Sequence, residues 1–143
     1  MSLDKNKALV REFIEEVMNK GNTEAIPDYC VTGSMFAGGI AGQVNTMKTA
    51  FPDNHFSIET ILAEGNQVAV QVMTNGTNTG PLVGLPAFGK LKQPEPPTGQ
   101  TVVSSGMYLF TLAEGKIASF TAELDQIAIL RQLGWSFIPP GTT

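Results

Sequence analysis

The sequence predicts one α+β domain, in which helices cover one face of a curved antiparallel sheet. Two observations support this fold class. Apolar residues repeat at helical spacing near both ends of the chain, whereas the middle alternates between apolar and polar residues, as half-buried strands do. A chain of 143 residues with 42% apolar residues has the size and composition of a single domain with its own core. Elements segregated in this order favour an α+β domain over an alternating α/β one.

The first third of the chain is predicted to be mostly helical. A first helix is expected over residues 4–20, where apolar side chains recur on one face, and Gly21 ends it. A short helical segment follows, limited in length by Pro27. Residues 29–42 hold four glycines and no sustained period, so a loop is expected there, with or without one short strand. A third helix is expected over residues 43–51.

The middle and later parts of the chain predict antiparallel strands. Two alternating runs flank a turn at residues 64–66, which is the pattern of a hairpin. A strand over residues 101–112 turns at Glu114-Gly115 into a last strand over residues 116–124. Between these hairpins, residues 80–99 contain five prolines and four glycines and predict a long loop.

That long loop carries apolar side chains that need a partner. They could cover the mouth of a pocket, pack on a partner subunit or close the edge of the sheet. The residues concerned are Leu82, Val83, Leu85, Phe88 and Leu91.

Composition excludes several kinds of partner. The net charge of −4 and the absence of a Lys/Arg cluster argue against nucleic acid and anionic membranes. No apolar run approaches the roughly 20 residues that a membrane-spanning helix needs. Cys30 is the single cysteine, and charged residues stand where a signal peptide would be apolar, so a cytoplasmic location is expected.

Asp125 stands at the joint between the last strand and a final helix. Helical spacing begins at Ile127, with Leu130 and Leu133 on the same stripe and Gly134 where a C-terminal cap would lie. Aspartate is a preferred N-cap residue, so Asp125 could simply start this helix. A carboxyl group at such a joint could also face a pocket. Both interpretations stay open.

The segment KI…LDQIAILRQLG resembles the closing signature of the SnoaL-like polyketide cyclases, within the NTF2-like superfamily. NKALVREFIEEVMNKGN, AFPDNHFSIETILAEGNQVAV, GTNTGPLVGLP and PPTGQTV agree with it, so the resemblance covers most of residues 6–134. It implies a cone-shaped fold and a small enzyme that needs no metal or cofactor. Such an enzyme would act on a hydrophobic carbonyl compound in an apolar pocket, as a cyclase or an isomerase. The alternative is a non-catalytic binding or scaffold protein of the same superfamily.

The resemblance implies that Asp125 is the catalytic acid/base. Its carboxyl group would take a proton from an activated carbon and return one to a carbonyl oxygen, which requires an apolar site that raises its pKa. Two family histidines are replaced here, one by Phe120 and one by Thr32, and the family tryptophan is replaced by Thr121. With Tyr29, Tyr108 and Glu123, these three residues are the expected substrate-binding groups.

The remaining candidates are expected to be structural. His55, the only histidine, is expected to be an exposed residue at the start of a strand. Cys30 is expected to be a small buried hydrophobe, and one histidine with one cysteine excludes the usual zinc spacings. The glycine-rich residues 38–42 lack the Lys-Ser/Thr ending of a phosphate-binding loop.

We also expect at least a homodimer. The strand over residues 101–112 carries apolar side chains on both faces, and helices cover only one of them. The alternative is that the loop over residues 80–99 folds back over the second face.

Overall fold

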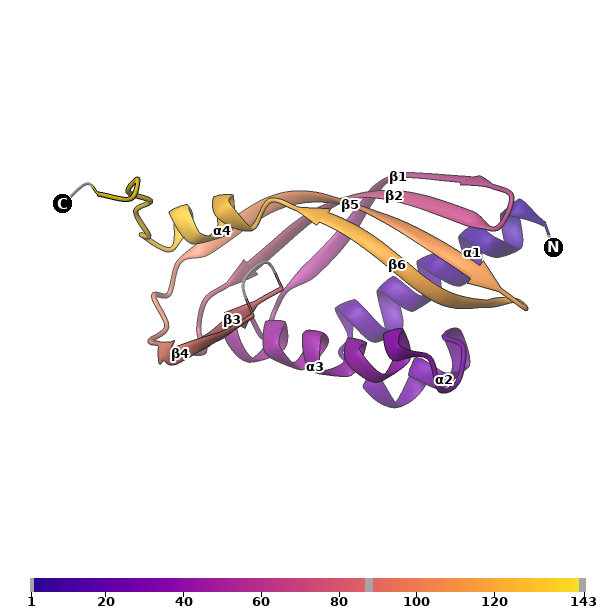
Figure 1. The fold of residues 1–143 in the computed structure, drawn as a ribbon, viewed down its shortest axis with the longest axis horizontal. Helices are drawn as coiled ribbons and strands as arrows, with labels where there is room; N and C mark the ends of the chain where they lie inside the picture. Colours follow the sequence, from indigo (N-terminus) through magenta and orange to yellow (C-terminus); the bar gives the residue numbers. More distant parts are fainter. Residues whose placement is uncertain (1, 87–88, 142–143) are drawn as a thin grey trace.

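The computed structural model describes residues 2–86 and 89–141. In chain order its elements are α1 (Leu3–Phe13), the π-helical turn η1 (Ile14–Asn19), the 3-10 turn η2 (Thr23–Ala25), α2 (Ile26–Tyr29), α3 (Met35–Ala50), β1 (His55–Glu64), β2 (Gln67–Thr77), β3 (Leu82–Leu85), β4 (Gly89–Glu95), β5 (Thr101–Ala113), β6 (Lys116–Leu124) and α4 (Gln126–Gln132). The four strands β1-β2-β5-β6 form a curved antiparallel sheet, and α1, α2 and α3 lie beneath its concave face (Figure 1). The predicted α+β class and cone are confirmed.

The first predicted helix is present as α1 and η1. Ser2 caps it, since its hydroxyl accepts a hydrogen bond from the Lys5 N–H at 3.1 Å. Its apolar stripe meets the sheet, where Val10, Phe13 and Val17 are fully buried. The last turn widens to π-helical geometry before the chain leaves the helix.

The prediction for residues 29–42 was wrong from Met35 onward, where α3 begins; residues 30–34 lie between the helices and include an isolated bridge from Cys30 to Ile117. Glycines at 38, 39 and 42 suggested a loop, since each costs a helix about 1 kcal/mol relative to alanine. Two features outweigh that cost. The Ser34 hydroxyl accepts a hydrogen bond from the Ala37 N–H at 3.0 Å, and Ile40 and Val44 are buried against the sheet.

The predicted hairpins β1–β2 and β5–β6 are confirmed. Along β5 the even-numbered residues are buried on the concave face and most odd-numbered ones are exposed on the convex face. A register shift between Ile58 and Thr60 reverses the alternation of β1, so Ile61 packs on the core and Leu62 is exposed.

Residues 80–99 do not form the predicted loop. They contain a two-stranded hairpin, β3–β4, beside α3 (Figure 1). Both strands of a two-stranded hairpin are edge strands, and each has one side without a hydrogen-bonded neighbour. Pro94 is tolerated because its missing N–H is not needed on that side. Leu82 and Leu85 are buried, whereas Phe88 lies outside the described residues.

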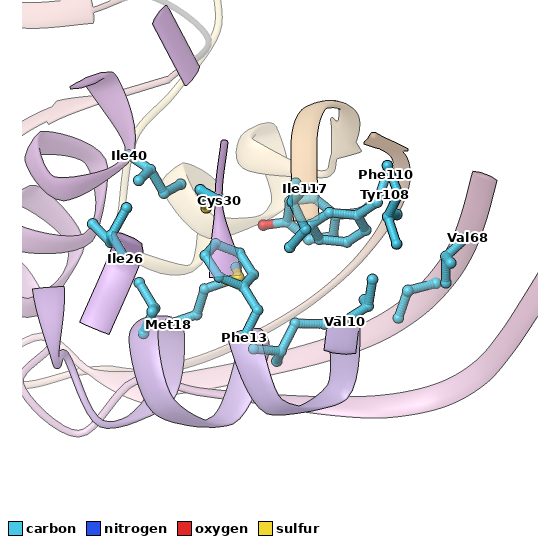
Figure 2. Packing of buried hydrophobic residues seen from close by; sticks show 14 of the residues in the cluster. Val10, Phe13, Met18, Ile26, Cys30, Ile40, Val68, Tyr108, Phe110 and Ile117 are labelled. Carbon is cyan, nitrogen blue, oxygen red and sulfur yellow. The ribbon is translucent and has the colours of Figure 1, made fainter. Parts of the chain in front are cut away.

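Buried side chains form two hydrophobic clusters. The main cluster lies between α1, α3 and the sheet and includes Val10, Phe13, Tyr108 and Phe110 (Figure 2). The second cluster joins the end of α3 to β3, the start of β5 and α4. Its residues from α4 are Ile129, Leu130 and Leu133; Ile127, expected on the same stripe, is exposed. Among the described helices, none is long and apolar enough to cross a bilayer.

Candidate functional site

A cavity of about 370 Å³ lies between α3 and the concave face of the sheet. Its walls are mainly apolar, and both hydrophobic clusters contribute to them. The apolar lining includes Ile40, Val44, Phe51, Phe56, Val102 and Phe120. Leu85 and Pro86 of the β3–β4 segment line it too, and with Gln43 they also border a more open groove of about 460 Å³ between α3 and the hairpin.

Three polar side chains that line the cavity are buried or nearly so: Asn54, Ser104 and Tyr108. The Ser104 hydroxyl donates to the main-chain oxygen of Asp125 at 3.0 Å, so its hydrogen bond is made within the protein. Asn54 is 7% exposed, and its Oδ1 atom has no hydrogen-bond partner among the described residues. This unused acceptor is enclosed by protein atoms rather than exposed in the cavity.

The entry into β1 is held by side chains of η1 and α3. The Asn19 amide bonds both main-chain groups of Phe56: its Nδ2 donates to the Phe56 oxygen at 3.1 Å and its Oδ1 accepts from the Phe56 N–H at 2.7 Å. Lys48 donates to the main-chain oxygens of Asn19 and Asn54. Burial lowers the pKa of Lys48, and Asp53 partly offsets this effect. These contacts fix the backbone at Asn54.

Tyr108 projects from β5 into an aromatic group on the concave face. Its ring stacks on Phe110 with centroids 5.7 Å apart and meets Phe120 edge-on at 5.2 Å. Figure 2 shows its hydroxyl on the side of Cys30 and Phe13, away from Val68. Tyr108 also lines the cavity. Burial raises the pKa of Tyr108, which keeps the hydroxyl protonated and able to donate a hydrogen bond.

Asp125 is exposed and caps α4. Its Oδ1 accepts a hydrogen bond from the Ala128 N–H at 3.0 Å, as the N-cap interpretation expects. Asp125 is not among the residues that line the cavity. Its main chain does bond to two residues that line it, Ser104 and Ser105. The acid/base role of Asp125 thus stays a prediction without support from its position.

Strand register explains where the other predicted site residues lie. Phe120 and Tyr108 share the concave face with Phe110 and Ala122 and line the cavity. Thr121 pairs with Leu109 and Glu123 with Met107, which are exposed on the convex face. Glu123 borders the cavity from this edge strand, whereas Thr121 does not line it.

The two candidates near α2 also lie away from the cavity. Tyr29 packs edge-on against Phe13 with ring centroids 6.2 Å apart, and burial raises its pKa. Thr32 is exposed in the turn before α3. The structure therefore brings Tyr108 and Phe120 together at the cavity; Glu123 borders it from a position in register with the convex face, and Asp125, Tyr29, Thr32 and Thr121 do not line it.

His55 and Cys30 have the surroundings expected of structural residues. His55 is exposed at the start of β1, and its Nδ1 lies 3.3 Å from the Ser57 hydroxyl. Cys30 is fully buried, and burial raises the pKa of its thiol to about 11. Within the described ranges, no group of three or more His, Cys, Asp or Glu residues is arranged to hold a metal ion.

Asn54 and Ser104 were not predicted from the sequence. Asn54 belongs to the segment Pro52-Asp53-Asn54, in which asparagine is an ordinary turn residue, so its pattern carries no signal of a site. Ser104 lies on the same face of β5 as Tyr108, since both are even-numbered. Knowing which face is concave would have identified Ser104 as a residue near the cavity.

The chain belongs to the SnoaL-like polyketide cyclase family, whose model matches residues 8–133. Solved structures share its fold over nearly their whole length. TsrD from Streptomyces laurentii is 16% identical with a TM-score of 0.78, and the match covers 94% of this chain and 98% of that one. AclR from Streptomyces galilaeus, named as a candidate hydroxylase, is 20% identical with a TM-score of 0.77. The match covers 97% of this chain and 91% of AclR.

A SnoaL-like polyketide cyclase from Agrobacterium tumefaciens is 16% identical with a TM-score of 0.70, and the match covers 94% of this chain and all of that one. Identities this low show a shared fold and do not transfer a reaction. Among curated proteins, none matches this sequence significantly.

Proposed function

We propose that this protein binds a small, uncharged, hydrophobic carbonyl compound in the cavity between α3 and the sheet, without a cofactor. The observation that carries the proposal is the cavity itself, whose volume of about 370 Å³ is typical of small-molecule sites. Apolar walls supply binding energy by burying apolar surface of the ligand, and a few neutral polar groups orient it.

The charge of the lining favours a neutral ligand. No Lys, Arg or His is among the described lining residues, and the side chain of Glu123 is in register with exposed Met107. A charged ligand would lose its hydration without gaining an ionic partner. We therefore expect a long-chain methyl ketone to bind at least about tenfold more tightly than the carboxylate of equal length.

Isothermal titration with these two probes tests the proposal. Val44 lines the cavity and is 7% exposed, so Val44→Phe should fill part of the space and weaken ketone binding. Val103→Phe on the convex face is the matched control, with circular dichroism to verify folding. Equal binding of ketone and carboxylate, or no binding of either, would refute the proposal.

A second candidate function is acid/base catalysis on the bound ligand, of the cyclase or isomerase type, with Asp125 as the acid/base. It is supported by membership of the family; the Asp125 main chain bonds to Ser104 and Ser105 at the cavity wall, but its carboxylate caps α4 and does not line the cavity. The Asp125 carboxylate would leave its cap, remove a proton from the carbon beside the carbonyl to give an enolate, and return it.

Deuterium exchange separates these two functions. In D2O, a catalyst exchanges the protons beside the ketone carbonyl faster than buffer does, and Asp125→Asn removes that acceleration while keeping a cap. A protein that binds the ketone and leaves the buffer rate unchanged is a binding protein only. A wild-type acceleration that survives in Asp125→Asn would exclude Asp125 as the base.

We further propose that the convex face mediates a homodimer. Val103, Met107 and Leu109 are exposed there, the first two by about half of their surface. The hairpin β3–β4 lies beside α3 on the other side of the sheet, so it does not cover these residues (Figure 1). A second copy of the chain would bury them.

A further inference from the structure

The backbone of β5 does not require glycine at position 106. Gly106 pairs with Val72 on β2 and with Leu124 on β6, and its φ angle is not in the left-handed region that favours glycine. Inside a strand, glycine is unfavourable because it has no side chain to pack and loses more conformational freedom on folding than other residues. The reason for this glycine must therefore lie in the side chains around it.

The side chain of Leu124 supplies that reason. Gly106 is buried and faces the concave side of the sheet, between Ser104 and Tyr108 on the same face of β5. A Cβ atom added to Gly106 would overlap the Leu124 Cδ2 atom and would lie 3.2 Å from the Glu123 main-chain oxygen. Leu124 therefore lies across Gly106, in the space that a side chain at position 106 would otherwise fill.

The position of the Leu124 side chain affects the size of the cavity. Leu124 lines the cavity together with Ser104, Tyr108 and Ala122, whereas Gly106 is not part of the lining. Because Leu124 lies against the backbone of β5, its side chain projects less far into the cavity than it would above a larger residue. An alanine at position 106 would push the Leu124 methyl group away from the sheet, and the cavity of about 370 Å³ lies on that side.

We infer that Gly106 and Leu124 together set the length of the ligand that the cavity accepts. Leu124 is the part of the wall that the ligand meets, and Gly106 determines how far this wall reaches into the cavity. The inference rests on the proposed function and specifies its ligand as a ketone whose apolar chain extends to the Leu124 side chain. Each further buried methylene should strengthen binding about fourfold until the chain meets Leu124, and a longer chain should gain nothing more.

A series of linear methyl ketones of increasing length tests this inference. Isothermal titration gives the limiting length, which is the chain length at which the affinity stops rising. Gly106→Ala should shorten the limiting length by about one carbon, because the added methyl group moves Leu124 into the cavity. Leu124→Ala should extend it by about two or three carbons, because it removes three carbons from the wall. Ketones too short to reach Leu124 should bind both variants as they bind the wild type.

The double variant shows whether Gly106 acts through Leu124. Alanine at position 124 has no Cδ2 atom, so Gly106→Ala combined with Leu124→Ala should have the same limiting length as Leu124→Ala alone. An effect of Gly106→Ala that persists without the leucine side chain would overturn the inference.

Leu62→Ala is the matched control, because Leu62 is 64% exposed on β1 and is not part of the cavity lining. This variant should keep the limiting length of the wild type. Should Gly106→Ala not fold, Leu124→Phe is measured instead and should shorten the limiting length, since it fills the same space from the other side of the pair. An unchanged limiting length in every Leu124 variant would overturn the inference and leave the proposed function intact. Failure of all the ketones to bind the wild type would refute the proposed function itself.

Discussion

The cap that Asp125 forms on α4 can be tested by removing its side-chain oxygen. Asp125→Ala deletes the 3.0 Å hydrogen bond from the Ala128 N–H, and α4 has only seven residues to compensate. Loss of an N-cap costs about 1 kcal/mol, within a range of roughly 0.5–2. For a domain of this size, that cost should lower the melting temperature by about 2–4 °C.

Asparagine is the informative comparison, since it caps helices about as well as aspartate but cannot exchange a proton. Urea unfolding followed by circular dichroism should therefore rank Asp125→Asn near the wild type and Asp125→Ala below it. Asp4→Ala removes an exposed carboxylate whose ion pair with Lys7 lies at the surface, so it should change the stability by less than about 0.5 kcal/mol. Equal destabilisation by Asp125→Asn and Asp125→Ala would refute the cap as the source of stability.

Two further predictions concern Cys30 and the convex face. Burial raises the pKa of the Cys30 thiol from 9.0 to about 11, so its contribution to stability is complete below pH 9.0 and is lost as the pH rises toward 11. Between pH 9.0 and about 11, the urea midpoint of Cys30→Ala should therefore fall less steeply with pH than that of the wild type. Parallel plots of midpoint against pH for the two proteins would contradict the buried-thiol explanation. Met107→Lys should convert the proposed dimer into a monomer near 15.2 kDa in sedimentation, whereas Glu95→Lys on β4 should not; a wild-type monomer at micromolar concentration would refute the dimer.

Alternating polarity predicted the strands of the main sheet well, because burial on one face imposes a period of two on the sequence. It could not identify the concave face. On β5, Tyr108 and Phe110 have one parity and Met107 and Leu109 the other, and both pairs are apolar. The helices decide between them, and no local pattern in β5 records where the helices pack. Placing Glu123 and Asp125 relative to the cavity depended on that missing fact.

Local signals also failed where tertiary contacts override them. The glycines at the start of α3 disfavour a helix, but the Ser34 cap and the burial of Ile40 stabilise one. The prolines of residues 80–99 disfavour strands, but a hairpin with open edges accepts them. Asn54 is hidden for a different reason: an asparagine in a turn and an asparagine in a binding cavity are identical in sequence.

The position of the cavity between the two hydrophobic clusters has a consequence for local unfolding. Ile40, Val44 and Phe56 reach it from the main cluster, and Phe51 and Ile129 reach it from the second. A ligand in contact with both sets is a noncovalent cross-link between the two hydrophobic clusters. Binding should therefore slow amide hydrogen exchange most in α4 and β3, since opening the second cluster would then require release of the ligand.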